Sequence, residues 1–253
     1  MKDFIDKISA ELNDADNFAA YPNLKSQTVN WISDDAEHMF AKNLALRKDE
    51  LTATGLSETE IQYSINSNGF RSPEFLEDNW LAVAGCSFTF GVGIPLESTW
   101  SYIVANQLGF KCANFGKPGA SPDTCFRMCY YWLYKLKPTA LIYLEPPLGR
   151  FELLNSSVKV DKNCGIYYAN IRSVSEKKYN LYVEWSRNFL NFDLNYRKNK
   201  LAIQAICDEI GIPMFSYSMH NKDLEIDKLS RDLLHSGTEA NRKFAERILS
   251  THF

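Results

Sequence analysis

The stretch Leu81-Ala-Val-Ala-Gly-Cys-Ser-Phe-Thr-Phe-Gly-Val-Gly93 predicts a buried strand that leads through a glycine turn to Ser87. Leu81 to Ala84 form a short apolar run bounded by Gly85, which is typical of a strand buried on both faces. A helix is predicted next, because apolar residues recur at helical spacing up to a glycine stop: Trp100, Ile103, Val104, Leu108 and Gly109. Ser87 is therefore expected at the carboxyl end of a strand, the edge where open parallel sheets bind ligands.

A second feature with chemical meaning lies near the C-terminus, where Asp232 precedes His235 by three residues. An isolated Gly-x-Ser is better interpreted as a turn, because a serine is a poor nucleophile without a base and a carboxylate that orients the base. Asp232-x-x-His235 supplies both groups from one local loop. Ser87, His235 and Asp232 are therefore the candidate nucleophile, base and orienting acid.

Three blocks together resemble the SGNH (GDSL-type) hydrolase superfamily. They are Gly85-Cys-Ser87, Asn114-Phe-Gly-Lys-Pro-Gly119 and Asp232-x-x-His235, in the family's order. The resemblance covers roughly Leu81 to Phe253. The first block of the family reads Gly-Asp-Ser, so Cys86 replaces an aspartate here. An α/β-hydrolase elbow would need a glycine where this chain has Thr89.

The resemblance implies a fold and a set of roles. The fold would be a flavodoxin-like three-layer α/β/α sandwich with a parallel sheet. The catalytic residues would be Ser87, Asp232 and His235, and the oxyanion hole would use the backbone N–H groups of Ser87 and Gly119. No metal and no organic cofactor is implied.

The third block of the family departs from its pattern in this chain. Gly-x-Asn-Asp should follow the predicted strand at 140–144, but Glu145-Pro-Pro-Leu-Gly-Arg150 stands there and offers no asparagine. Arg150 is the nearest side chain with fixed donors and a permanent charge, so it is a candidate substitute donor. An alternative role for Arg150 is a salt bridge on the surface or at the base of an insertion.

Strands and helices alternate regularly after Leu81. The strands are expected at 81–84, 112–115, 140–144 and 213–218, and the helices at 97–109, 121–137, 201–210 and 240–249. Ser121 and Pro122 supply a cap and a first-turn proline for the second of these helices. Strand-helix-strand order makes neighbouring strands parallel and predicts the three-layer sandwich.

Two segments lie outside this alternation. Residues 1–79 form an N-terminal helical extension that is expected to pack on the main domain, residues 80–253. The extension is expected to have one helix with Phe4, Ile5, Ile8 and Leu12 on one face, a second that starts at Ser33-Asp-Asp-Ala-Glu37 and runs through Phe40 and Leu44, and a strand at 61–65. Arg71, which follows that strand, is expected to be structural rather than catalytic.

An insertion is expected at about 151–196, because roughly sixty residues separate two strands that a short connection would join. It is predicted to contain a hairpin at 157–171 and a helix at 179–192. Its aromatic residues either line an acyl or sugar pocket or pack the insertion onto the sandwich.

The composition limits the class of protein. The 253 residues are 45% hydrophobic and 23% charged, which is ordinary for a soluble globular chain. A net charge of −3 and a pI near 5.9 give no support for nucleic-acid binding. Without a bilayer-spanning run or a signal peptide, no membrane contact and a cytoplasmic location are expected. The six cysteines are expected to be reduced thiols, with Cys125 and Cys129 facing the core.

The function expected from these features is that of a serine esterase that hydrolyses a small-acyl, acetyl-like ester, for instance on a glycan. Three other interpretations stay open. The same site could pass the acyl group to a sugar hydroxyl, as an O-acyltransferase does. A member without the third block could be a non-catalytic carbohydrate-binding or structural module, and the chain could also be a small-molecule-binding α/β domain. The sequence does not indicate the oligomeric state.

Overall fold

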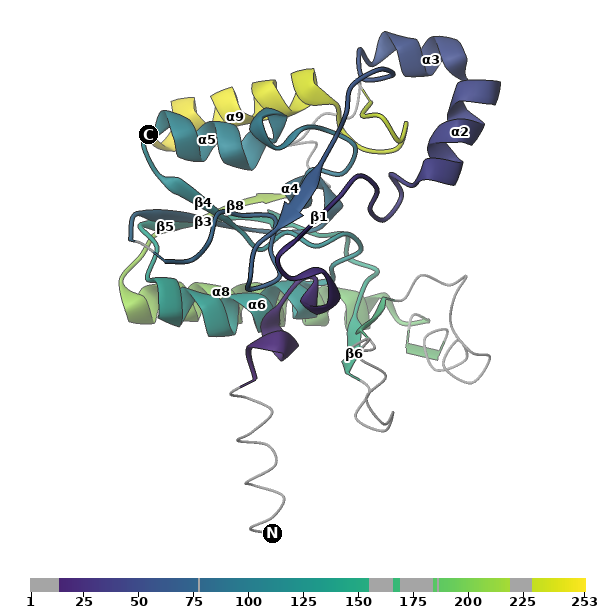
Figure 1. Ribbon diagram of the computed structural model, residues 1–253. Helices are drawn as coiled ribbons and strands as arrows, with labels where there is room; N and C mark the ends of the chain where they lie inside the picture. The colour runs from purple at the N-terminus through teal and green to yellow at the C-terminus, as the bar shows by residue number, and fades with distance from the viewer. Residues whose placement is uncertain (1–13, 77, 155–165, 169–183, 186, 219–228) are drawn as a thin grey trace.

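A four-stranded parallel sheet forms the centre of the protein, seen in a computed structural model that describes residues 14–76, 78–154, 166–168, 184–185, 187–218 and 229–253 (Figure 1). The strand order is β4-β3-β5-β8, and every neighbouring pair is parallel. The strands are β3 (Trp80–Ala84), β4 (Lys111–Asn114), β5 (Ala140–Glu145) and β8 (Met214–Ser218). These are the four strands that the sequence predicts.

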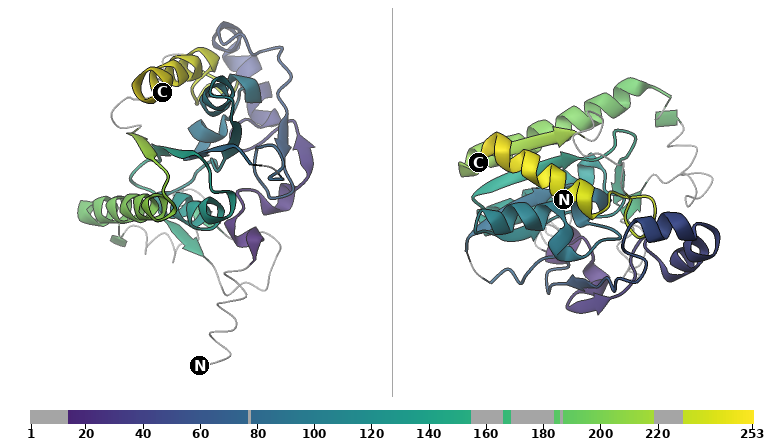
Figure 2. Two further views of the ribbon diagram at one scale, coloured as in Figure 1. Left: turned by 90° about the vertical axis from the view of Figure 1, so that its left-hand side faces the viewer. Right: turned by 90° about the horizontal axis from the view of Figure 1, so that it is seen from above.

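Helices cover both faces of this sheet, as the views in Figures 1 and 2 show. The pair on one face is α5 (Trp100–Gln107) and α9 (Thr238–His252), and the pair on the other is α6 (Pro122–Leu136) and α8 (Phe189–Ile210). The chain is therefore a three-layer α/β/α sandwich, which confirms the predicted fold class. β3 and β5 are buried along their whole length, which explains their uninterrupted apolar sequence.

The side chains of β3 pack into two separate hydrophobic cores, one on each face of the sheet. Leu81 and Val83 belong to the core under α5 and α9, while Ala82 and Ala84 belong to the core over α6 and α8. Because side chains alternate along a strand, a shift by one residue would exchange these faces. This register fixes where β3 ends and so positions the residues that follow it.

The described cysteines are all free and buried, with Cys125 and Cys129 in the α6 and α8 core as expected; Cys164 lies outside the described residues.

The helix before β8 is longer than predicted. The sequence indicates a helix at 201–210 and assigns the preceding residues to the insertion, whereas α8 runs without a break from Phe189 to Ile210. Asn188 caps its first turn by accepting a hydrogen bond from the N–H of Leu190 at 3.0 Å. The early turns leave Phe189, Leu190 and Leu194 exposed, so they lack the one-sided apolar pattern that identifies a helix in a sequence.

The insertion begins with a short antiparallel pair, β6 (Glu152–Leu154) and β7 (Ile166–Tyr168). The predicted hairpin at 157–171 lies mostly outside the described residues, as does most of the predicted helix at 179–192. Arg127 of α6 holds the start of the insertion by two hydrogen bonds of 2.9 Å to the carboxylate of Glu152.

The described part of the N-terminal segment, residues 14–76, contains six short elements before β3. They are η1 (Ala15–Phe18), η2 (Pro22–Leu24), β1 (Gln27–Val29), α2 (Glu37–Leu46), α3 (Lys48–Ala53) and β2 (Tyr63–Ile65). β2 lies within the predicted strand and pairs antiparallel with β1, which was not predicted. The expected helix around Phe4 to Leu12 lies outside the described residues. The helix that the sequence predicts from the stretch at 33–37 is α2, which begins at the end of that stretch, at Glu37. Ser33 has a positive φ of 53°, Ala36 is the N-cap, and Asp35 is buried.

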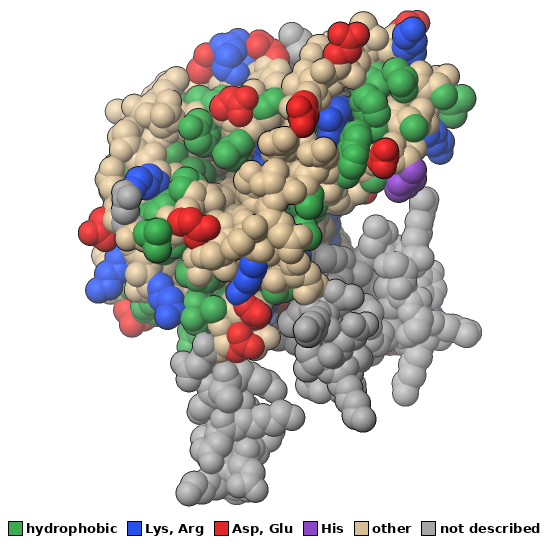
Figure 3. Space-filling model, viewed as in Figure 1, with side chains coloured by type: hydrophobic (Ala, Val, Ile, Leu, Met, Phe, Trp, Pro, Cys, Tyr) green, Lys and Arg blue, Asp and Glu red, His purple; other side chains and the backbone are tan. Residues whose placement is uncertain are grey.

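The helical hairpin of α2 and α3 stands out from the sandwich (Figure 1). Hydrophobic side chains gather on the surface over these two helices (Figure 3), where Leu44 and Leu46 are exposed. Only Asn43 and Leu51 of the two helices are buried. Asn43 donates a hydrogen bond of 3.2 Å to the backbone carbonyl of Asp232, so this hairpin contacts the loop of the predicted acid and base. None of the helices in the described ranges has the length and apolar character needed to cross a membrane.

Candidate active site

Ser87 lies directly after β3, as the first residue of the short helix α4 (Ser87–Phe90). The turn before it needs a glycine, because a Cβ on Gly85 would stand 2.1 Å from the Thr89 hydroxyl and 2.7 Å from the Leu144 carbonyl oxygen. The close approach to β5 therefore explains the first glycine of the block. The Ser87 side chain lies at the carboxyl edge of the sheet and is almost entirely buried.

Ser87, His235 and Asp232 form one chain of hydrogen bonds. The Ser87 Oγ lies 2.7 Å from the His235 Nε2, and the His235 Nδ1 lies 2.5 Å from the Asp232 Oδ2. The first contact joins residues 148 positions apart and the second joins residues three apart, and the loop before α9 brings the imidazole over the edge of the sheet. A serine with a histidine and a carboxylate in this order has the arrangement needed to activate a nucleophile.

The loop at 229–236 closes on itself. The N–H of Ser230 donates to the carbonyl of His235 at 2.8 Å, and Leu229 and Ser236 form an antiparallel bridge. Between them Leu233 has a φ of 58°, a left-handed conformation that is uncommon for a residue with a side chain. The turn places Asp232 and His235 side by side at the cost of local backbone strain.

Asp232 is held as a carboxylate by the same loop. Its Oδ1 accepts hydrogen bonds from the Ser230 hydroxyl at 2.5 Å and from the N–H groups of Leu234 at 3.0 Å and His235 at 3.1 Å. Burial favours the neutral carboxyl, but the hydrogen bonds from His235, Ser230 and Leu234 outweigh it and hold the pKa of Asp232 below its usual value. A permanent negative charge therefore faces the imidazole.

The second block packs against the serine helix. Asn114 donates to the carbonyl of Thr89 at 2.8 Å, and its side-chain oxygen accepts the N–H of Gly116 at 2.8 Å. The N–H of Lys117 donates to the carbonyl of Gly85 at 3.1 Å. These bonds hold the loop that leads to Gly119 against the helix of Ser87. The position of Asn114 at the end of a strand is only a weak sign of this role in the sequence.

The two expected oxyanion donors, the N–H groups of Ser87 and Gly119, have no recorded hydrogen bond to the described part of the chain. Gly119 has a φ of 74°. Backbone N–H groups without partners beside a nucleophile are the donors that an oxyanion hole requires.

A buried carboxylate lies at the end of β5, just before the prolines that stand where the resemblance predicts an asparagine. Glu145, the last residue of β5, accepts hydrogen bonds from Lys200 of α8 at 2.5 Å, from the Tyr196 hydroxyl and from the Ser216 hydroxyl. No pattern in the sequence points to Glu145 as a site residue. Two of these donors come from α8 and one from β8, so Glu145 anchors both elements to the end of β5.

Arg150 lies next to the second block. Its Nη1 donates to the carbonyl of Ala120 at 3.3 Å, one residue past Gly119. The contact brings the guanidinium to the loop that carries the expected oxyanion donor, and it leaves other N–H groups of the fork for a further acceptor. The contact also fits an anchoring role, because Arg150 joins the residues after β5 to the Gly119 loop.

We expect Arg150→Ala to lower turnover of an activated small ester by at least about tenfold with little change in KM if the guanidinium supplies an oxyanion donor. Steady-state kinetics on the variant and on Pro147→Asn separate the roles. A silent Arg150→Ala, together with a faster Pro147→Asn, would instead mean that the missing asparagine has no substitute.

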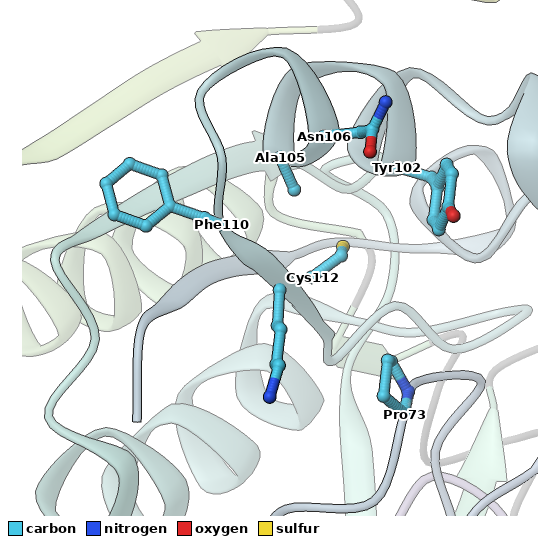
Figure 4. Close-up of a pocket in the computed structure, with 7 residues that line it drawn as sticks. Pro73, Tyr102, Ala105, Asn106, Phe110 and Cys112 are labelled. Atoms are coloured by element: carbon cyan, nitrogen blue, oxygen red, sulfur yellow. The ribbon is translucent and has the colours of Figure 1, made fainter. Parts of the chain in front are cut away.

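The cavities elsewhere do not reach these residues. The cavity drawn in Figure 4 has a volume of about 210 Å³ and lies between α5, β4 and Pro73, where Tyr102, Phe110 and Cys112 line it. A second cavity, about 200 Å³, lies between η3 (Leu96–Ser98), α5 and α9. Among the described residues, no group of three or more His, Cys, Asp or Glu side chains is arranged to hold a metal ion.

Comparisons with known proteins gave matches only among solved structures. No protein-family model matches the chain, and no curated protein does. The psychrotrophic esterase EstA from Pseudoalteromonas sp., in a structure inhibited by monoethylphosphonate, is similar at 12% identity and a TM-score of 0.36, covering 69% of this chain and 96% of that one.

Two further solved structures are similar to the same extent. TesA shares 12% identity at a TM-score of 0.36, covering 68% of this chain and 97% of its own. A protein from Desulfitobacterium hafniense DCB-2, described as lipolytic and of the G-D-S-L family, shares 13% identity at a TM-score of 0.34, covering 68% of this chain and 98% of its own.

Proposed function

We propose that this chain is a serine esterase of the SGNH type that hydrolyses a small-acyl ester. The observation that carries the proposal is the unbroken contact from the Ser87 Oγ through the His235 imidazole to the Asp232 carboxylate. The N–H groups of Ser87 and Gly119, which have no hydrogen-bond partner among the described residues, support it, because acyl transfer needs donors for the oxyanion as well as a nucleophile.

The reaction has two steps. His235 Nε2 takes the proton of Ser87 as the Oγ attacks the ester carbonyl, and the imidazolium then gives this proton to the departing alcohol as the C–O bond breaks. In the second step His235 removes a proton from water, the hydroxide attacks the acyl-enzyme, and the proton returns to Ser87 as the acid leaves. Asp232 holds the imidazole in the tautomer with the proton on Nδ1 and stabilises the imidazolium.

A small acyl group suits the surroundings of the nucleophile. Ser87 and His235 are both buried, and the Phe88 ring packs on the imidazole with 4.9 Å between ring centres. The Phe88 ring covers one side of the imidazole next to Ser87, which favours a small acyl group over a long one. We therefore propose an acetyl-like ester as substrate, and an acetylated glycan as its natural form.

The test is covalent labelling of the wild-type protein with a fluorophosphonate, followed by peptide mapping. We expect one label per chain, on Ser87, and faster hydrolysis of p-nitrophenyl acetate than of the butyrate. Absence of labelling, or labelling of another residue, would overturn the proposal. An acceptor sugar that diverts the acetyl group from water would make the enzyme an O-acyltransferase with the same site.

A further inference from the structure

Asp35, a residue of the N-terminal segment, is tied to the loop of Asp232 and His235. Its carboxylate receives two hydrogen bonds from the Arg231 guanidinium, from Nε to Oδ1 at 3.0 Å and from Nη2 to Oδ2 at 2.6 Å. Asp35 is 1% exposed and Arg231 is 5% exposed. A paired fork of this kind fixes the relative orientation of both partners as well as their distance.

All other contacts recorded for the Arg231 side chain also lie in the N-terminal segment. The guanidinium donates to the carbonyls of Thr59 and Asn30, each at 3.2 Å, and its Cζ lies 4.3 Å from the centre of the Trp31 ring. A buried guanidinium without a paired carboxylate is strongly unfavourable, so the position of Asp35 determines the position of the Arg231 side chain. The residue next to it is Asp232, the acid of the proposed triad.

A closed ring of hydrogen bonds continues from Asp35 to the serine side of the site. The Tyr63 hydroxyl donates to Asp35 Oδ2 at 2.5 Å and accepts the N–H of Gly93 at 2.9 Å, and the Gly93 carbonyl accepts the N–H of Arg231 at 3.0 Å. Burial and the nearby Asp35 carboxylate raise the pKa of Tyr63 well above its ordinary value, so the hydroxyl keeps its proton and can make both bonds.

Gly93 belongs to the loop that leaves the helix of Ser87. The N–H groups of Gly91 and Val92 both donate to the carbonyl of Ser87, at 2.9 and 3.2 Å. A Cβ on Gly93, which has a φ of 74°, would stand 2.6 Å from the Ser230 Oγ. The serine loop and the acid–base loop therefore touch at Gly93, and Tyr63 and Asp35 hold them together from one side.

We infer that Asp35, acting through Arg231 and Tyr63, is a positioning residue that sets the separation between the Ser87 hydroxyl and the His235 imidazole. The inference rests on the proposed function, because it assigns Asp35 a part in that reaction. Asp35 contacts no residue of the triad and no reacting atom. The N-terminal segment is then a component of the active site, and the strained turn at Leu233 is the part of the loop that its contacts restrain.

The experiment compares Tyr63→Phe, Asp35→Asn and Arg231→Lys with a matched control, Arg127→Lys. Arg127 and Glu152 also form a buried two-bond pair, but no bond of theirs reaches the loops of Ser87 or His235. For each variant we measure kcat and KM on an activated acetyl ester, the melting temperature, and the downfield proton NMR signal of the His235 Nδ1–H. Tyr63→Phe keeps the ion pair and so tests the ring of bonds even if Asp35→Asn does not fold.

We expect kcat of the three variants to fall about ten- to a hundredfold with KM nearly unchanged, because small displacements of reacting groups are costly in rate. Their Nδ1–H signal should shift or broaden, whereas Arg127→Lys lowers the melting temperature and leaves kcat and the signal unchanged. Variants that lose stability while kcat and the signal stay as in the wild type would overturn the inference. If the wild type neither reacts with a fluorophosphonate nor turns over, the proposed function fails, and the NMR signal alone decides whether Asp35 positions His235.

Discussion

Ser87→Ala and His235→Ala should each lower turnover of an activated acetyl ester by about five to six orders of magnitude, the loss seen when either member of a nucleophile–base unit is removed. The reason is the 2.7 Å contact between the Ser87 Oγ and the His235 Nε2. Alanine at 87 removes the atom that attacks, and alanine at 235 leaves a hydroxyl that keeps its proton. Because the two groups act as one unit, the double variant should be no slower than either single variant.

The measurement is residual hydrolysis by purified protein, together with fluorophosphonate labelling. His38→Ala is the control, because His38 lies exposed on α2, and this variant should keep the rate of the wild type. Circular dichroism checks that the folds are alike. Normal labelling of His235→Ala would remove the histidine from the mechanism and leave Ser87 activated by a group not named here.

The parts of the fold that the sequence predicts well are those with a local pattern. The apolar run of β3 is buried on both faces, and α6 begins with a capping box of Ser121 and Thr124 and a proline in its first turn. Such patterns involve only neighbouring residues, so they can be recognised in the sequence without knowledge of the rest of the fold. The loop of Asp232 and His235 was also predictable, since a spacing of three residues is enough for one turn to present both.

Contacts between residues far apart in the chain leave no comparable pattern in the sequence. Asp35 lies in a stretch that resembles a helix start, where an acidic residue in the first turn is common. Its partner Arg231 is 196 residues away, and the ion pair turns the carboxylate inward instead. The sequence therefore predicts a helix start in the stretch that begins at Ser33, whereas α2 begins at Glu37, after Asp35.

Asp232→Asn should lower turnover by about 10⁴-fold, as expected when an amide replaces the carboxylate that orients a catalytic histidine. The Oδ1 of Asp232 accepts from the Ser230 hydroxyl and from two backbone N–H groups, and an amide oxygen can keep these three bonds. The amide NH₂ then faces His235 Nδ1, where the Asp232 Oδ2 now stands 2.5 Å away. A donor at that place forces the ring into the tautomer with its proton on Nε2, which can no longer accept the proton of Ser87.

The pH dependence of stability separates the change of tautomer in Asp232→Asn from the loss of the carboxylate charge. The pKa of Asp232 is lower in the folded chain than its ordinary value of 3.8, so the carboxylate stabilises the fold at pH values above 3.8 and this contribution is lost as the pH falls through the folded value. Asp232→Asn should therefore remove part of the stability at neutral pH and make unfolding less dependent on acid. Thermal melts between pH 3 and 8 measure this change.

In the wild type the pKa of Asp232 lies below its ordinary value of 3.8, so a change of kcat at pH values well above 3.8 does not report protonation of this carboxylate. The Asn variant should keep a weak, nearly pH-independent rate, because its base is blocked at every pH by the wrong tautomer. The matched variant is Ser230→Ala, which removes one bond to the same carboxylate and leaves the tautomer unchanged, so its rate should fall far less. A similar loss in both variants would mean that Asp232 acts by shaping the loop, and that the orientation of the ring by its charge contributes little.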